Sequence, residues 1–143
     1  MSFQNILVVC VGNICRSPMA EALLKQAYPL KNIFSAGLDG LVGRSVDPLA
    51  IECMSEVGID ISAHIVQKLD AKMLIQADII LAMTTGQVRE IEERWTFSKG
   101  KVFRLCHWSG ENVSDPYRQE KAVFVSIRDL IIKGVGSWRP YLS

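Results

Sequence analysis

A cysteine and an arginine, separated by five residues, stand where the first predicted strand passes into the first predicted helix. The segment reads Cys10-Val11-Gly12-Asn13-Ile14-Cys15-Arg16-Ser17. A loop of this kind can turn its backbone N–H groups inward and bind a tetrahedral dianion. Arg16 can add a guanidinium fork to two phosphate oxygens, and these positive dipoles and charges favour the thiolate form of Cys10. The segment therefore predicts an activated nucleophile beneath a bound phosphorus atom.

Three polar or small residues of this loop fit the same interpretation. Gly12 permits the backbone turn, Asn13 can adopt a positive φ and bond across the loop, and Ser17 can donate to the sulfur of Cys10. The segment is neither GxGxxG nor a Walker loop with its lysine, which argues against dinucleotides and nucleoside triphosphates. The alternative for Cys10 is an ordinary buried strand cysteine.

An aspartate in the second half of the chain can supply the acid that such chemistry needs. A thiolate that displaces phosphate from a phenol requires a proton for the leaving oxygen and later a base for water. Asp115, in Ser114-Asp115-Pro116-Tyr117, follows the last predicted strand and so reaches the same sheet edge as the cysteine loop. Pro116 stiffens that loop, although Asp-Pro is also a common turn.

Strands and helices that alternate along the chain position these residues. Apolar β-rich runs predict strands at 5–10, 33–36, 78–83 and 101–105. Helices are expected at 17–28, 47–57, 70–76, 84–95 and 119–133, with Ser17 as the cap of the first. This order predicts a single α/β domain with a parallel sheet and helices on both faces. The segment 134–143 is left without a role.

Composition excludes several other classes of protein. The 143 residues hold 16 Lys and Arg against 15 Asp and Glu, so no basic field for nucleic acid or anionic lipid is expected. The start of the chain lacks a signal-peptide pattern, and no apolar run could span a bilayer, which predicts a cytoplasmic protein. Four cysteines without a paired CxxC motif predict free thiols, with no metal and no cofactor. A monomer is the default.

The residues quoted above resemble the signature of the low-molecular-weight protein tyrosine phosphatase family. Val9 to Pro18 is similar to its phosphate-binding loop, and Asp115-Pro116-Tyr117 to its acid loop. The resemblance implies a four-stranded parallel sheet in the order 2-1-3-4. It implies Cys10 as nucleophile, Arg16 as phosphate clamp and Asp115 as general acid and base. The remaining substrate-binding loop residues are then Val11, Gly12, Asn13, Ile14, Cys15 and Ser17.

The similarity extends to the bacterial subset associated with capsule and exopolysaccharide production. Shared features are the segment 37–43, His107-Trp108 and Asp115-Pro116-Tyr117-Arg118. Within this resemblance, Leu41 and Tyr117 form the two pocket walls, and the partner is a phosphotyrosine protein, expected to be a tyrosine autokinase. The family also implies that Cys15 forms a reversible disulfide with Cys10, whereas a plain helix-packing role stays open.

Two other functions compete with this reading. A thiol-dependent arsenate reductase has the same fold and loop, but it needs further cysteines in the chain's second half, and residues 78–100 contain none. A non-catalytic phosphotyrosine-binding module would tolerate loss of the thiol or the acid, and both are present.

Overall fold

The centre of the molecule is a four-stranded parallel sheet. The computed structural model describes residues 3–143, in which the strands are β1 (Asn5–Cys10), β2 (Asn32–Gly37), β3 (Ile79–Ala82) and β4 (Val102–Arg104). Their order across the sheet is β2-β1-β3-β4, and all neighbours run parallel. The predicted sheet and its strand order are confirmed.

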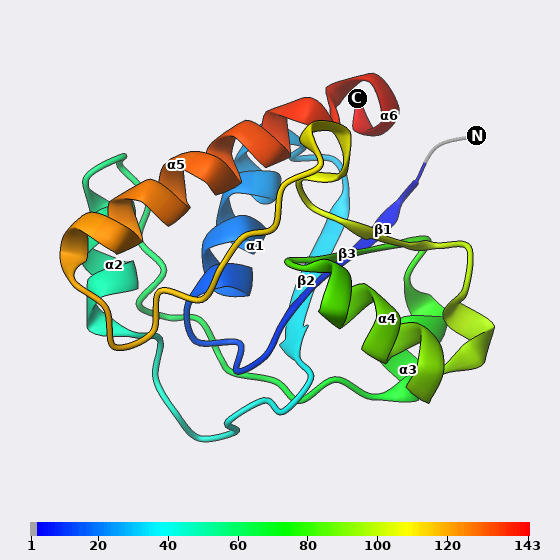
Figure 1. Cartoon of the computed structure of the whole chain (residues 1–143). Helices are drawn as coiled ribbons and strands as arrows, with labels where there is room; N and C mark the ends of the chain where they lie inside the picture. The colour runs from blue at the N-terminus through cyan, green and yellow to red at the C-terminus, as the bar shows by residue number, and fades with distance from the viewer. Residues whose placement is uncertain (1–2) are drawn as a thin grey trace.

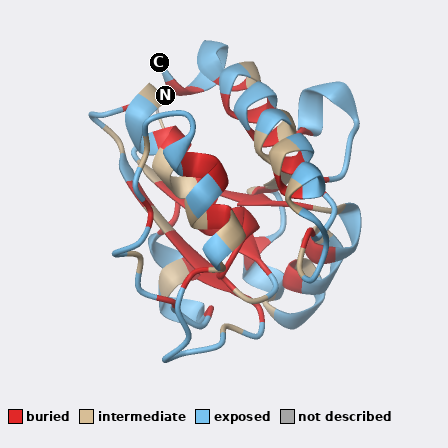
Figure 2. Cartoon of the chain, turned by 90° about the vertical axis from the view of Figure 1, so that its left-hand side faces the viewer, coloured by how far each residue is buried: buried red, intermediate tan, exposed pale blue. Residues whose placement is uncertain are grey.

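Helices cover both faces of this sheet, as Figure 1 shows. They are α1 (Arg16–Ala27), α2 (Pro48–Ser55), α3 (Ala71–Gln76), α4 (Thr85–Arg94), α5 (Lys121–Ser137) and α6 (Arg139–Leu142). The helices α1, α2 and α5 pack together on one face, whereas α3 and α4 lie on the other. The buried residues concentrate in the strands and on the inner sides of the helices (Figure 2). The three layers that the sequence predicts are therefore present.

Residues of β1 alternate between two apolar cores. Ile6, Val8 and Cys10 belong to the core beneath α1 and α5, whereas Leu7 and Val9 belong to the core beneath α3 and α4. Successive side chains of a strand point to opposite faces, so a central strand must be apolar at every position. This explains why the run Ile6 to Val9 has no polar residue, and it places the Cys10 thiol on the α1 side.

The start of α1 and the end of α5 differ from those predicted. The helix α1 begins at Arg16, and its cap residue Cys15 makes no side-chain capping bond, so the prediction of Ser17 as cap is wrong. The helix α5 continues to Ser137 instead of ending at Lys133. Gly134 is a poor helix former, but a Cβ there would lie 2.8 Å from Cys106 Sγ. The glycine thus permits close packing within the helix and does not end it.

The last residues of the chain are docked against the sheet. Trp138 is 2% exposed, and its indole Nε1–H donates to the carbonyl of Leu105 at 2.7 Å. Trp108 stacks on Tyr141, with ring centres 4.7 Å apart. Residues 134–143 therefore close the end of one core. Within residues 3–143, no helix combines the length and the hydropathy that a membrane span requires.

Candidate active site

The loop from Cys10 to Arg16 leaves β1 at the carboxyl edge of the sheet and is held from outside by the segment that follows β2. Backbone N–H groups of Leu38 and Asp39 donate to the carbonyls of Cys10 and Val11, both at 2.9 Å. Farther along, Asp47 N–H donates to the Ile14 carbonyl at 2.9 Å. Because the carbonyls of the loop point outward to these donors, its amide N–H groups are left to face the other side.

That inner side is a cradle of unpaired backbone donors above a buried thiol. The N–H groups of Gly12, Ile14 and Cys15 make no hydrogen bond to the part of the chain that the structure describes. The Asn13 N–H points at Cys10 Sγ at 3.2 Å, and the Ser17 hydroxyl lies 2.9 Å from the same sulfur. Cys10 is 3% exposed. Convergent N–H dipoles of this kind bind an oxyanion, and they lie directly around the sulfur.

Asn13 fixes the shape of this cradle from behind. Its φ of 58° is in the left-handed region, and its side chain is fully buried. The amide nitrogen donates to the hydroxyls of Ser17 (2.7 Å) and Ser35 (3.0 Å). The amide oxygen accepts from the Gln67 backbone N–H and from His64 Nε2, both at 2.9 Å. Asn13 thus bonds across the loop as predicted, and neither its side chain nor that of Ser17 lines the pocket.

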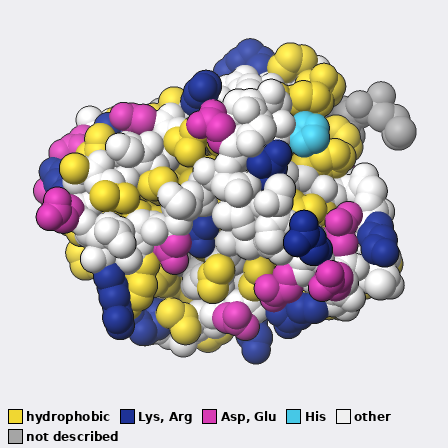
Figure 3. Space-filling view, viewed as in Figure 1, with side chains coloured by type: hydrophobic (Ala, Val, Ile, Leu, Met, Phe, Trp, Pro, Cys, Tyr) yellow, Lys and Arg dark blue, Asp and Glu magenta, His cyan; other side chains and the backbone are white. Residues whose placement is uncertain are grey.

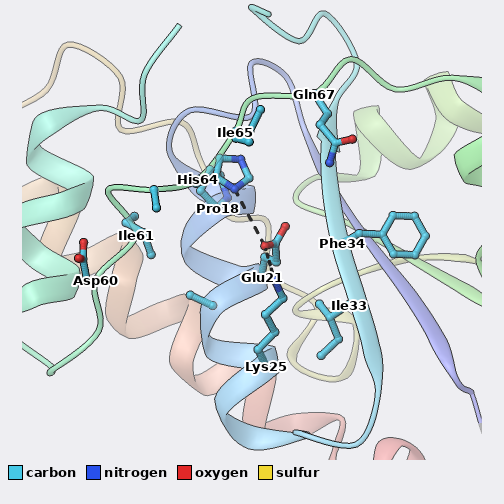
Figure 4. Close-up of a pocket in the computed structure, with 12 residues that line it drawn as sticks. Pro18, Glu21, Lys25, Ile33, Phe34, Asp60, Ile61, His64, Ile65 and Gln67 are labelled. Carbon is cyan, nitrogen blue, oxygen red and sulfur yellow. Dashed lines mark hydrogen bonds and ion pairs between the residues drawn. The ribbon is translucent and has the colours of Figure 1, made fainter. Parts of the chain in front are cut away.

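His64 belongs to this support and not to the reacting centre. An amide oxygen only accepts, so Nε2 of His64 carries the proton in its bond to Asn13. Figure 4 shows the imidazole above α1, in a neighbouring pocket. The His64 Nδ1 lies 4.0 Å from the Glu21 carboxylate, which also pairs with Lys25. Burial lowers the pKa of His64 against the opposing effect of Glu21. These contacts give His64 a structural role.

Arg16 and Asp115 meet at the open side of the cradle. Arg16 Nη2 lies 3.8 Å from Asp115 Oδ2, and Nη1 donates to the carbonyl of Val113 at 2.9 Å. The Val113 N–H in turn donates to Met83 at the end of β3, at 2.8 Å. The other oxygen of Asp115, Oδ1, accepts from the Tyr117 N–H at 3.0 Å, so Oδ2 is the oxygen that is turned toward Arg16.

One small pocket contains most of the residues that the sequence singled out. Its volume is about 200 Å³, and its lining consists of Cys10, Val11, Gly12, Ile14, Cys15, Arg16, Leu41, Asp115 and Tyr117. Leu41 and Tyr117 come from the loops after β2 and after β4, so two distant segments supply its side walls. The neighbouring Arg118 and Arg44 guanidinium groups hold the pKa of Tyr117 below its ordinary value.

The second thiol of the loop has a different environment from the first. Burial raises the pKa of Cys15 far above its ordinary value, and the nearby Asp47 and Asp115 carboxylates act in the same direction. Cys15 is therefore a neutral thiol at pH 7 and not an anionic nucleophile. Cys53 and Cys106 are buried in the core away from the pocket. All four cysteines are free.

The surface around the site carries charges of both signs. Figure 3 shows acidic and basic side chains interspersed on the face seen in Figure 1. Among the described residues 3–143, no three His, Cys, Asp or Glu side chains are grouped so as to hold a metal ion. The groups that the pocket itself offers to an anion are the loop amides and the Arg16 guanidinium.

Several supporting residues were missed by reasoning from the sequence. Ser35, Gln67 and Val113 contact the site residues through single hydrogen bonds, and each is distant in the chain from its partner. Gly37 begins the segment 37–43 on which the family resemblance depends, but its role was not predicted: a Cβ there would lie 2.5 Å from the Val11 carbonyl oxygen. The only local signal for Gly37 was its place directly after a predicted strand.

A parallel α/β sheet whose first strand ends in a cysteine-arginine anion cradle is the architecture of a small cysteine-dependent phosphatase. The family described as low molecular weight phosphotyrosine protein phosphatase matches residues 5–142. The chain belongs to this family and is a low molecular weight protein-tyrosine phosphatase, which confirms the family predicted from the sequence.

Individual relatives agree with this assignment. The chain is 53% identical over 142 residues to the low molecular weight protein-tyrosine-phosphatase Ptp of Acinetobacter johnsonii, covering 99% of this chain and 100% of that one. It is 46% identical to the probable phosphatase EpsP of Ralstonia solanacearum, covering 96% and 94%. The solved structure of Vibrio vulnificus Wzb has a TM-score of 0.95 at 36% identity, covering 99% and 100%. These names agree with the predicted bacterial subset.

Proposed function

We propose that the chain hydrolyses phosphotyrosine in two steps through a cysteinyl-phosphate intermediate. The proposal rests on one observation: a single pocket contains a buried thiol, a cradle of unpaired amides, Arg16 and Asp115. The Vibrio vulnificus relative was solved with benzylphosphonate, a ligand that joins a phosphonate to an aromatic ring. A pocket with the cradle at its floor and Leu41 and Tyr117 as walls suits the same combination.

In the first step, the thiolate of Cys10 attacks phosphorus in line with the phenolic oxygen. The sulfur–phosphorus bond forms as the phosphorus–oxygen bond breaks, and Asp115 gives its proton to the leaving oxygen, which yields tyrosine. In the second step, Asp115 takes a proton from water, which attacks phosphorus and releases inorganic phosphate and the thiolate. Arg16 and the loop amides stabilise the negative charge on the phosphoryl oxygens in both steps.

The catalytic roles can be tested on p-nitrophenyl phosphate. Cys10→Ser should lower kcat/KM by at least about 10³-fold, and Asp115→Asn by about 10²- to 10⁴-fold. Cys53→Ser, which replaces a buried thiol outside the pocket, and Asp129→Asn, which replaces an exposed aspartate on α5, serve as matched controls that retain activity. Wild-type turnover by Cys10→Ser, or loss of wild-type activity with a chelator, would contradict the mechanism.

The substrate class can be tested with matched phosphopeptides. Leu41 and Tyr117 form walls that a phosphotyrosine ring can fill, whereas phosphoserine cannot both reach the cradle and contact them. We expect a preference for the phosphotyrosine peptide, and equal rates would refute it. For the physiological partner we propose a tyrosine autokinase of the same organism. Loss of phosphotyrosine from the purified autokinase on incubation with the wild-type chain, but not with Cys10→Ser, is the expected result.

A further inference from the structure

Two arginines lie at the mouth of the pocket, one beside each wall. Arg44 is in the turn that begins at Leu41, where its backbone N–H donates to the Leu41 carbonyl at 2.9 Å. Arg118 follows Tyr117 directly, and its Cζ lies 5.3 Å from the centre of the Tyr117 ring. Both arginines are exposed. Each wall of the pocket therefore carries a guanidinium group into solvent.

The two guanidinium groups lie on either side of Tyr117. Both lower the pKa of this phenol, Arg118 more than Arg44, although they come from different loops. The backbone of Arg118 is held at a φ of 65°, in the left-handed region that few side chains adopt, and this turn keeps Arg118 beside the ring. Two positive charges thus lie beside one neutral phenol at the rim of the candidate pocket.

No carboxylate compensates these two charges. Within residues 3–143, neither Arg44 nor Arg118 forms an ion pair, whereas Arg16, Arg94 and Arg128 each pair with an acidic side chain. Two adjacent guanidinium groups repel each other and gain most from an external anion that can accept from both. The rim is consequently an incomplete charge cluster that a ligand can complete.

From this arrangement we infer that Arg44 and Arg118 bind a second anionic group of the substrate, a carboxylate or phosphate close to the phosphotyrosine in the peptide. The inference rests on the proposed function, since it assumes that the phosphotyrosine ring lies between Leu41 and Tyr117. A peptide that leaves the pocket past Tyr117 brings its neighbouring side chains to the two guanidinium groups. The preferred substrates are then peptides in which phosphotyrosine has an acidic or phosphorylated neighbour.

The test compares peptides that differ only beside the phosphotyrosine. One series carries alanine, glutamate, phosphoserine or lysine at each flanking position in turn, and kcat/KM is normalised to the rate on p-nitrophenyl phosphate. The variants are Arg44→Gln, Arg118→Gln, their combination, and the charge reversal Arg44→Glu. Arg89→Gln, which removes an exposed arginine on α4, is the matched control. Thermal unfolding of each variant shows that it is folded at the assay temperature.

We expect the wild-type chain to prefer the anionic peptides over the alanine peptide by about three- to tenfold at low salt, with a smaller ratio at high salt. The double variant should bring this ratio close to one, Arg44→Glu should favour the lysine peptide, and Arg89→Gln should keep the wild-type ratio. A larger ratio for phosphoserine than for glutamate identifies phosphate as the better ligand.

The assays distinguish a failure of this inference from a failure of the proposed function. An active wild-type enzyme that hydrolyses all peptides at equal normalised rates, or a preference that survives in the double variant, would overturn the rim inference alone. A wild-type chain that does not turn over p-nitrophenyl phosphate, or a Cys10→Ser variant that does, would overturn the proposed function itself.

Discussion

Replacing Gly37 with alanine should displace the phosphate cradle without unfolding the protein. A Cβ at this position would lie 2.5 Å from the Val11 carbonyl oxygen and 2.9 Å from the Asn13 nitrogen, all of them backbone contacts. The shorter distance falls about 0.9 Å below ordinary contact, which begins at 3.4 Å. The strand cannot retreat easily, because the Gly37 N–H and carbonyl are bonded to Gln67 and Leu69 at 2.9 and 2.8 Å. The loop must therefore move by nearly 1 Å.

A displacement of about 1 Å at groups that orient reacting atoms can cost about 10²-fold in rate. We therefore expect Gly37→Ala to lower kcat/KM on p-nitrophenyl phosphate by about 10²-fold. Overpacking should cost about 1–3 kcal/mol of stability, less than the usual total of about 5–15 kcal/mol, so the variant should stay folded at 25 °C.

The matched control is Gly136→Ala, on an exposed part of α5 where a Cβ would meet nothing within 4 Å. This change should leave kcat/KM unaltered and stabilise the helix by up to about 1 kcal/mol. The two variants are compared by steady-state kinetics and urea unfolding at the same temperature. A folded Gly37→Ala enzyme with kcat/KM within about threefold of wild type would refute the argument that this glycine positions the cradle.

Three further outcomes follow from other contacts. Iodoacetamide at neutral pH should label Cys10 before Cys15, because burial raises the pKa of Cys15; peptide mass spectrometry that found Cys15 labelled first would contradict this. Asp78→Asn should lower Tm at pH 7, because backbone N–H donors lower the pKa of the Asp78 carboxyl below its ordinary value of 3.8. The ionised carboxylate stabilises the fold above pH 3.8, and this stabilisation is lost as the pH falls through the lowered pKa. A Tm deficit of the variant at pH 2 as large as that at pH 7 would count against this role. Trp138→Phe should lower the free energy of unfolding by about 1–3 kcal/mol by leaving the buried Leu105 carbonyl unbonded, and urea titration with unchanged stability would disprove that role.

The strands and their order could be predicted because the signals for them are local. A central parallel strand is buried on both faces, so β1 appears in the sequence as an unbroken apolar run. The predicted ranges of β3 and β4 are one residue too long at each end, and that of β2 is one residue too short at each end. Asp78 and Lys101 lie just before their strands and bond to the sheet through single backbone bonds. The prediction that α5 ends before Gly134 was wrong, because the low helix propensity of glycine favours a stop there. Only the close packing against Cys106 explains why the helix has a glycine at this position.

The candidate site likewise contains some residues that the sequence could predict and others that it could not. Cys10, Arg16 and Asp115 could be named from spacing and from their place after strands, and the structure brings them into one pocket. The residues that hold the Asn13 side chain could not be named, because Ser35 and His64 contact it from segments that are far away in the chain. No periodicity or propensity encodes such a contact, since each depends on the packing of β2 and of the loop after α2.

Arg16 shows why the cradle and the acid loop form one unit. Its Nη1 is committed to the Val113 carbonyl, and Val113 is itself bonded to the end of β3, so the guanidinium orientation is set by the strand that neighbours β1. A guanidinium has five N–H donors, and this one can hold Val113 and still present its remaining donors to a phosphoryl group. Lysine has a single ammonium without that fixed fork and could not serve both directions with the same geometry. In the proposed mechanism, the residue that binds the anion is thus also the residue that pairs with Asp115, at 3.8 Å.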